Sequence, residues 1–190
     1  MAENRASKSG FAAEAHKKIK KKFDSQLAGR MLQWVKEVTD LDIDTNGEWD
    51  EFHKTLQDGQ VLCRLINALQ PETIPEKKIN TNKMAFKQME NINHFLAGAQ
   101  KLGVPSEEIF QTVDLWEKQN LAAVVTCLES LARKAYKYGQ KSLGPKESEA
   151  NIREWTEEQL QAGKSIISLQ YGSNRGANAS GINFGNTRHM

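Results

Sequence analysis

The sequence has few cysteines and no long apolar run, and both absences limit what kind of protein it can be. Only Cys63 and Cys127 are cysteines among its 190 residues. Both fall on apolar faces of expected helices, which predicts reduced, buried thiols in a cytoplasmic protein rather than disulfides or metal ligands. No stretch approaches the ~20 apolar residues that cross a bilayer, and residues 1–5 lack the apolar segment of a secretory signal. No membrane span is therefore expected.

The sequence also lacks the motifs of the common enzyme chemistries. It has no glycine-rich phosphate loop, no nucleophile elbow, and no His and Cys set at metal-ligand spacing. We therefore expect no catalytic residue, no metal site and no cofactor. A binding or structural role is favoured over an enzyme.

One acidic loop matches a calcium-binding loop in part. Asp42, Asp44 and Asn46 stand at its first, third and fifth positions, and Gly47 stands at the sixth. The twelfth position requires a bidentate Glu, and His53 stands there instead. The favoured interpretation is a polar loop with a turn at Asn46-Gly47. Calcium binding is the alternative.

Charge is unevenly distributed along the chain. Residues 1–22 carry seven Lys and Arg against two acids, whereas residues 23–138 carry 13 against 17. Residues 139–190 carry six against five. Because the central region is slightly acidic, we do not expect nucleic acid as a partner.

Apolar residues recur at helical spacing through the central region, and no stretch alternates convincingly with period two. The most strongly patterned segment begins at Asp58-Gly59. There we expect Asp58 to cap the helix and Gly59 to let another backbone segment approach. The pattern predicts an all-α domain of about four main helices with short connecting helices. Main helices are expected over residues 24–39, 58–69, 83–101 and 120–135, and short ones over 48–56 and 105–110.

Two helices carry specific expectations about their buried faces. In the first, Trp34 is expected to anchor the core. In the third main helix, a single stripe is expected to face the core. Its members are Phe86, Met89, Ile92, Leu96 and Ala99.

Residues 1–23 form a basic lead-in with a narrow apolar stripe at every fourth residue, made of Phe11, Ala15, Ile19 and Phe23. The favoured interpretation is a solvated helix that docks this stripe on the core. The alternative is a contact for an acidic protein or a lipid surface. The cations of this second reading are Lys17, Lys18, Lys20, Lys21 and Lys22.

Beyond the domain at 24–138, residues 139–163 are expected to form a polar linker with one short helix. That helix begins with a capping box, Thr156 to Gln159, and ends at Gly163. The tail, 164–190, has four glycines and no acidic residue. It is expected to be flexible, because such a composition buries too little surface to fold alone.

Several motifs together resemble the calponin and transgelin family. Asp58-Gly59 and the helix that follows look like the signature helix of calponin homology domains. The stretch 167–181 resembles the calponin-like repeat, with Arg175 where the repeat usually has Lys. Further agreement lies at Phe86–Ile92, Gly103-Val104-Pro105 and Phe110–Leu115.

The resemblance implies a protein that binds F-actin and decorates, stabilises or cross-links filaments. A monomer on the cytoplasmic actin cytoskeleton is expected, and a signalling adaptor that uses the single domain is the alternative. The resemblance assigns much of the actin contact to the repeat. Its expected residues are Lys164, Ile167, Leu169, Gln170, Tyr171, Gly172, Asn174, Arg175, Gly176, Gly181 and Arg188.

Overall fold

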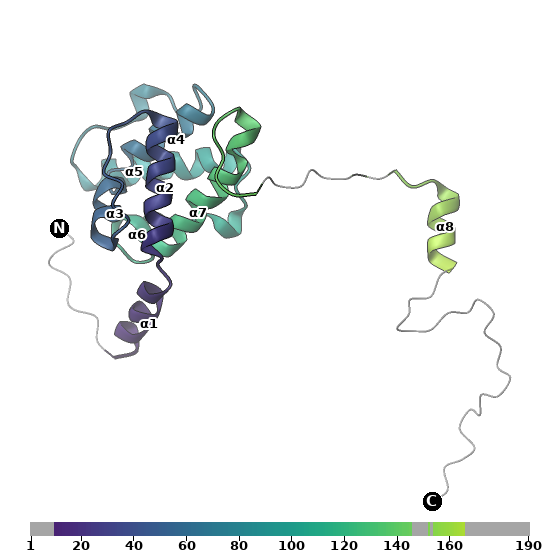
Figure 1. Cartoon of the computed structure of the whole chain (residues 1–190), viewed down its shortest axis with the longest axis horizontal. Coiled ribbons are helices and arrows are strands. Elements are labelled where there is room, and N and C mark those ends of the chain that lie inside the picture. The colour runs from purple at the N-terminus through teal and green to yellow at the C-terminus, as the bar shows by residue number, and fades with distance from the viewer. Residues whose placement is uncertain (1–9, 146–151, 153, 166–190) are drawn as a thin grey trace, which may run out of the picture. The chain divides into compact units, whose positions relative to one another are not determined.

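The computed structural model describes residues 10–145, 152 and 154–165 (Figure 1). The chain divides into two units, 1–147 and 148–190. Every regular element in the described residues is helical, which confirms the predicted all-α class.

The first unit holds α1 (Gly10–Lys21), α2 (Ser25–Thr39), α3 (Trp49–Leu56), α4 (Gln60–Leu69), η2 (Glu76–Lys78), α5 (Ala85–Lys101), η3 (Ser106–Glu108), α6 (Thr112–Trp116), α7 (Leu121–Lys134) and η4 (Ala135–Tyr138). The second holds α8 (Glu157–Ser165). The helix α6 is not among the helices predicted from the sequence. Asp114 closes its first turn by accepting from the backbone N–H of Gln111 at 2.8 Å.

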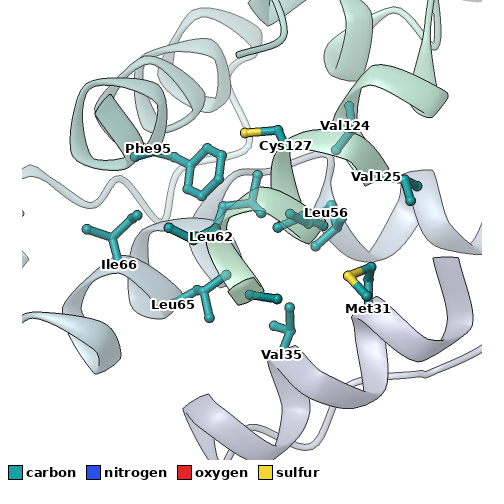
Figure 2. Packing of buried hydrophobic residues seen from close by; sticks show 14 of the residues in the cluster. Met31, Val35, Leu56, Leu62, Leu65, Ile66, Phe95, Val124, Val125 and Cys127 are labelled. Atoms are coloured by element: carbon teal, nitrogen blue, oxygen red, sulfur yellow. The ribbon is translucent and has the colours of Figure 1, made fainter. Parts of the chain in front are cut away.

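The helix α4 is the centre of the core and packs against α2, α3 and α5. Leu62, Leu65 and Ile66 are fully buried. Figure 2 shows them between Val35 of α2 and Phe95 of α5. A helix that buries apolar residues on nearly all sides requires neighbours on all sides, and the surrounding helices supply them.

The start of α4 differs by one residue from the expectation. Gly59, with φ of 70°, is the N-cap residue, and Asp58 Oδ1 accepts from the backbone N–H of Gln60 at 2.9 Å. A Cβ at Gly59 would lie 2.8 Å from Asn91 Cβ and 2.9 Å from the backbone nitrogen of Ile92. The expected close backbone approach at Gly59 is therefore confirmed.

A buried asparagine joins this turn to the loop before α5. Asn91 is fully buried, and its Nδ2 donates to the carbonyls of Asp58 at 2.9 Å and Asn80 at 2.8 Å. Its Oδ1 accepts from the backbone N–H of Asn80 at 2.8 Å. One side chain thus satisfies three backbone groups of Asp58 and Asn80, a role that the apolar pattern does not reveal.

The buried face of α5 is rotated from the expected stripe. Phe95 is fully buried and Leu96 only half-buried, whereas Phe86 is 60% exposed. The expectation for Phe86 was wrong because the face through Ile92, Phe95 and Ala99 projects back to residues 88 and 85, whereas Leu96 packs against the edge of the core. Gly98 fixes this rotation, since a Cβ there would lie 2.8 Å from Ile66 Cγ2.

Trp34 is fully buried, which confirms the expected core anchor. Its Nε1 donates to the carbonyl of Lys141 at 2.6 Å. The backbone N–H of Leu143 donates to the carbonyl of Ala132 at 3.2 Å. The first residues after η4, interpreted as linker, are therefore held against the helices.

In the second unit, α8 has the expected capping box. The backbone N–H of Thr156 donates to Gln159 Oε1 at 3.2 Å, and the N–H of Gln159 donates to Thr156 Oγ1 at 3.4 Å. The helix continues to Ser165, two residues beyond the expected stop at Gly163.

Candidate functional site

The basic helix α1 presents its lysines to solvent. Lys17, Lys18, Lys20 and Lys21 of α1 are all exposed, and so is Lys22, which directly follows the helix. Lys18 pairs with Glu14 at 2.8 Å, and Lys20 Nζ lies 5.6 Å from the Trp49 ring centroid. The other three have no ion pair within the described part of the chain. This surface can therefore offer cations to an acidic partner without breaking existing pairs.

Only the C-terminal end of α1 is anchored. The ring of Phe23 packs edge-on against Trp49 at 5.0 Å and against Phe52 at 5.6 Å. Phe11 is 93% exposed and Ala15 is also exposed. The expectation that the whole stripe docks on the core was wrong for these two residues, because the start of α1 extends beyond the residues that pack against the domain.

A pocket of about 320 Å³ opens at the junction of α1 and α2. Lys22 and Asp24 line one side of it and the start of α7 lines the other. Asp24 Oδ1 already accepts from the backbone N–H groups of Gln26 and Leu27 at 2.9 and 3.1 Å. Its carboxylate therefore serves as the N-cap of α2.

The expected repeat residues fall almost entirely outside the described residues. Lys164 belongs to α8 by its backbone. The others, which remain predictions, are Ile167, Leu169, Gln170, Tyr171, Gly172, Asn174, Arg175, Gly176, Gly181 and Arg188.

The acidic loop before α3 is held by its own side chains. Asp44 Oδ1 accepts from the N–H of Asn46 at 3.0 Å, and Asn46 Oδ1 accepts from the N–H of Glu48 at 3.0 Å. Asp42 pairs with Lys36 at 2.8 Å, which holds the pKa of Asp42 below its usual value. The loop oxygens are thus engaged as in a polar turn.

His53, which occupies the twelfth position of the loop pattern, is buried with 5% of its surface exposed. Its Nε2 lies 3.4 Å from the carbonyl oxygen of Trp116 in α6, so the ring points into the domain and away from the loop. Burial, with the nearby charge of Lys118, lowers the pKa of His53 from 6.5 to about 4. The ring is therefore neutral at neutral pH.

The two cysteines lie in the core. Both are free and buried, and burial raises the pKa of each thiol to about 12. A thiol with so high a pKa is a poor nucleophile at neutral pH. Across residues 10–145, 152 and 154–165, no cluster of three His, Cys, Asp or Glu residues has the arrangement of a metal site. None of the helices described there has the length and apolarity that a bilayer crossing requires.

Known families match both parts of the sequence. Residues 25–137 match the calponin homology (CH) domain, and residues 167–190 match the calponin family repeat. Myophilin of Echinococcus granulosus is 42% identical over 184 residues, which cover 95% of this chain and 94% of myophilin. Muscle-specific protein 20 of Drosophila melanogaster is 39% identical over 162 residues, which cover 84% and 85% of the two chains.

Solved structures share the fold. Vav1, in a structure with an allosteric inhibitor, aligns at a TM-score of 0.57 and 25% identity over 66% of this chain and 24% of the Vav1 chain. The calponin homology domain of Rng2 from Schizosaccharomyces pombe aligns at a TM-score of 0.54 and 24% identity, over 76% and 87% of the two chains. The second similarity shows the fold alone.

The helical fold and the two family matches define a CH-domain protein with one C-terminal calponin repeat. The chain belongs to the calponin and transgelin family, as its near full-length relatives show. This is a non-enzymatic, cytoskeletal family, and membership indicates an actin-associated protein.

Proposed function

We propose that this protein binds actin filaments directly and stabilises or cross-links them, with the C-terminal repeat providing much of the contact. The observation that carries the proposal is the calponin family repeat at 167–190, placed after a CH domain. From residue 164 onward the chain has three Lys and Arg residues and no acid. A basic segment gains encounter rate and affinity on an acidic filament.

The exposed lysines of α1 provide a second contact. Lys17, Lys21 and Lys22 are solvent-exposed and stand outside the ion pairs of the described residues. Two linked contacts raise avidity through effective concentration, even when each is weak. If they engage different subunits or different filaments, a monomer in the cytoplasm stabilises or bundles them.

Co-sedimentation with actin filaments tests the proposal. The variants are a deletion of residues 166–190, which spares α8, and Arg175→Glu in the full-length chain. Each is expected to weaken binding by about tenfold, which is about 1.4 kcal/mol. Arg64→Glu is the matched control. Arg64 is exposed on α4, and its substitution makes the same change of charge at a position far from the repeat in sequence. Circular dichroism confirms that all variants are folded.

Equal pelleting of all four proteins would contradict a role for the repeat. The triple variant Lys17→Gln, Lys21→Gln, Lys22→Gln then tests α1 alone. Binding should also weaken as salt rises, since the Debye length is about 8 Å at physiological ionic strength.

A signalling adaptor is the second candidate. It is favoured by the similarity to Vav1, a protein whose GEF activity is blocked by inhibitors. If neither the full-length chain nor any variant pellets with filaments, this function replaces filament binding.

A further inference from the structure

A cavity of about 740 Å³ is formed by the end of α4 and the loop that leads to η2. This volume falls within the range of pockets that bind small ligands or short peptide segments. We call it the α4–η2 cavity, and the residues that line it are Asn67, Pro71, Glu72, Ile74, Pro75, Glu76 and Lys77. None of them belongs to the surfaces proposed above for filament binding.

Hydrogen bonds and prolines fix the wall of this cavity. Asn67 Nδ2 donates to the carbonyl of Ile74 at 2.8 Å, and Asn67 Oδ1 accepts from the backbone N–H of Ile74 at 2.9 Å. Pro71 and Pro75 restrict the loop further, because their rings fix φ. A cavity whose wall is already ordered loses less conformational entropy when it binds a ligand.

Glu72 holds a strained backbone conformation in this wall. Its φ of 61° lies in the left-handed region, which few residues other than glycine, Asn and Asp adopt. The Glu72 side chain is exposed and makes no hydrogen bond or ion pair within the described part of the chain. No stabilising contact there compensates the strain. Strained residues of this kind cluster at binding sites, which favours a ligand for the carboxylate.

The charge around the cavity favours a cation. Two carboxylates, Glu72 and Glu76, line it against the single ammonium group of Lys77, which leaves one net negative charge. Glu76 is also exposed and forms no ion pair with any described residue. The C-terminal end of α4 is the negative end of its helix dipole, and its last turn has no basic residue.

We propose that the α4–η2 cavity binds an arginine side chain within a basic peptide segment of a partner protein. The aliphatic part of the arginine packs on Pro71, Ile74 and Pro75. Its guanidinium group donates hydrogen bonds to the carboxylates of Glu72 and Glu76. Arginine fits better than lysine, because its guanidinium is less strongly hydrated and its planar fork of donors serves two carboxylates. This interaction is separate from filament binding and does not depend on it.

Nuclear magnetic resonance of the isotope-labelled full-length chain tests the proposal. The probe is the peptide acetyl-Leu-Arg-Leu-amide, and the matched peptides carry Gln or Glu in place of Arg. The Arg peptide is expected to shift the backbone amide signals of Asn67, Ile74 and Lys77. The signal of Thr126, which lines the pocket at the junction of α1 and α2, should not move. Glu76→Gln is expected to weaken binding of the Arg peptide about fivefold.

Glu72→Gly removes the second carboxylate and keeps the turn, because glycine adopts a positive φ without strain. The matched control is Asp40→Gly. Asp40 is also an exposed acid with a positive φ, of 53°, and it does not line the cavity. We expect Glu72→Gly to lose most of the binding and Asp40→Gly to keep it.

Equal signal shifts with the Gln or the Glu peptide would overturn the proposal, and so would an equal loss of binding in Asp40→Gly. If deletion of residues 166–190 strengthens binding of the Arg peptide, the basic tail of this chain competes for the cavity, and a partner protein is not the occupant. The variants are also sedimented with actin filaments. Glu72→Gly should pellet as the parent does, and a loss would make the cavity a filament contact, which contradicts the proposal.

Discussion

The helices α4 and α1 both carry apolar stripes, yet the stripe of α4 is buried and much of the stripe of α1 is exposed to solvent. The stripe of α4 is wide and carries no Lys, and its Leu62, Leu65 and Ile66 are fully buried. The stripe of α1 is narrow and flanked by lysines, and Phe11 at its start is 93% exposed. The comparison teaches that stripe width, rather than the mere presence of a stripe, decides whether a helix is buried here, because a narrow stripe gains too little from burial to hold lysines near the core.

The largest expected effect is on the buried side of this comparison. Leu65→Ala should lower the free energy of unfolding by about 2–5 kcal/mol, because it leaves a cavity in a close-packed core. Urea denaturation measures it. A midpoint unchanged from the parent would show that Leu65 is not packed as the structure places it.

Asn91→Ala should have the next largest effect, about 2–3 kcal/mol, since it leaves the backbone groups of Asp58 and Asn80 without their partner. The control is Asn93→Ala, two residues along the same helix. The side chain of Asn93 is exposed, and within the described part of the chain it accepts a single hydrogen bond, from Thr112. Urea denaturation of both variants should show a clearly larger loss of unfolding free energy for Asn91→Ala than for Asn93→Ala. Equal destabilisation of the two variants would mean that the hydrogen bonds of Asn91 contribute no more to stability than those of an exposed Asn.

The third prediction concerns pH. His53 is neutral in the folded state, with its pKa lowered to about 4, whereas the unfolded chain takes up a proton near 6.5. Its contribution to stability is therefore complete above pH 6.5 and is lost as pH falls towards 4, on the order of 2–3 kcal/mol. Thermal melts of the parent and of His53→Gln, which has no titration in this range, should converge as pH falls. Parallel pH profiles would contradict this.

On the exposed side, Phe11→Ala should change the free energy of unfolding by less than about 0.5 kcal/mol, as for a surface site. Phe23→Ala is the companion, because Phe23 packs on Trp49 and Phe52 and its loss should be measurable. Together, the two variants show which end of the stripe formed by Phe11 and Phe23 packs against the domain. A large cost at Phe11 would extend the docked region along the helix.

The smallest expected effect is that of calcium. Millimolar calcium should leave the melting temperature unchanged, because the loop oxygens of Asp44 and Asn46 already accept backbone hydrogen bonds and His53 faces α6. Differential scanning calorimetry with calcium and with a chelator measures this. A shift of several degrees would show ligand binding to the folded state.

Much of the fold could be predicted because local signals agree with the packing. The helices α2 and α7 lie where apolar spacing and caps place them, with Asp24 and Asn120 as N-caps. The rotation of α5 could not be read from its sequence, since two overlapping stripes, one through Phe95 and one through Leu96, are both apolar. The face that is fully buried includes Gly98, which lies close to Ile66, a residue 32 positions earlier in the chain.

Part of the candidate site can likewise be predicted from the sequence, and part cannot. The lysines of α1 and the basic, acid-free tail are visible in composition alone. The exposure of Phe86 is not, because it depends on the rotation of α5.

The sequence by itself determined the helical class, the reduced cysteines, the basic ends of the chain and the family, because periodicity, composition and motif spacing are local properties. Only the tertiary structure decided that Asn91 joins the turn at Gly59 to the loop at Asn80, that His53 turns away from its loop, and that Phe86 faces solvent. Each of these depends on which backbone groups and side chains meet across the fold. Long-range contacts of this kind are fixed by packing and hydrogen-bond satisfaction, which no local pattern specifies.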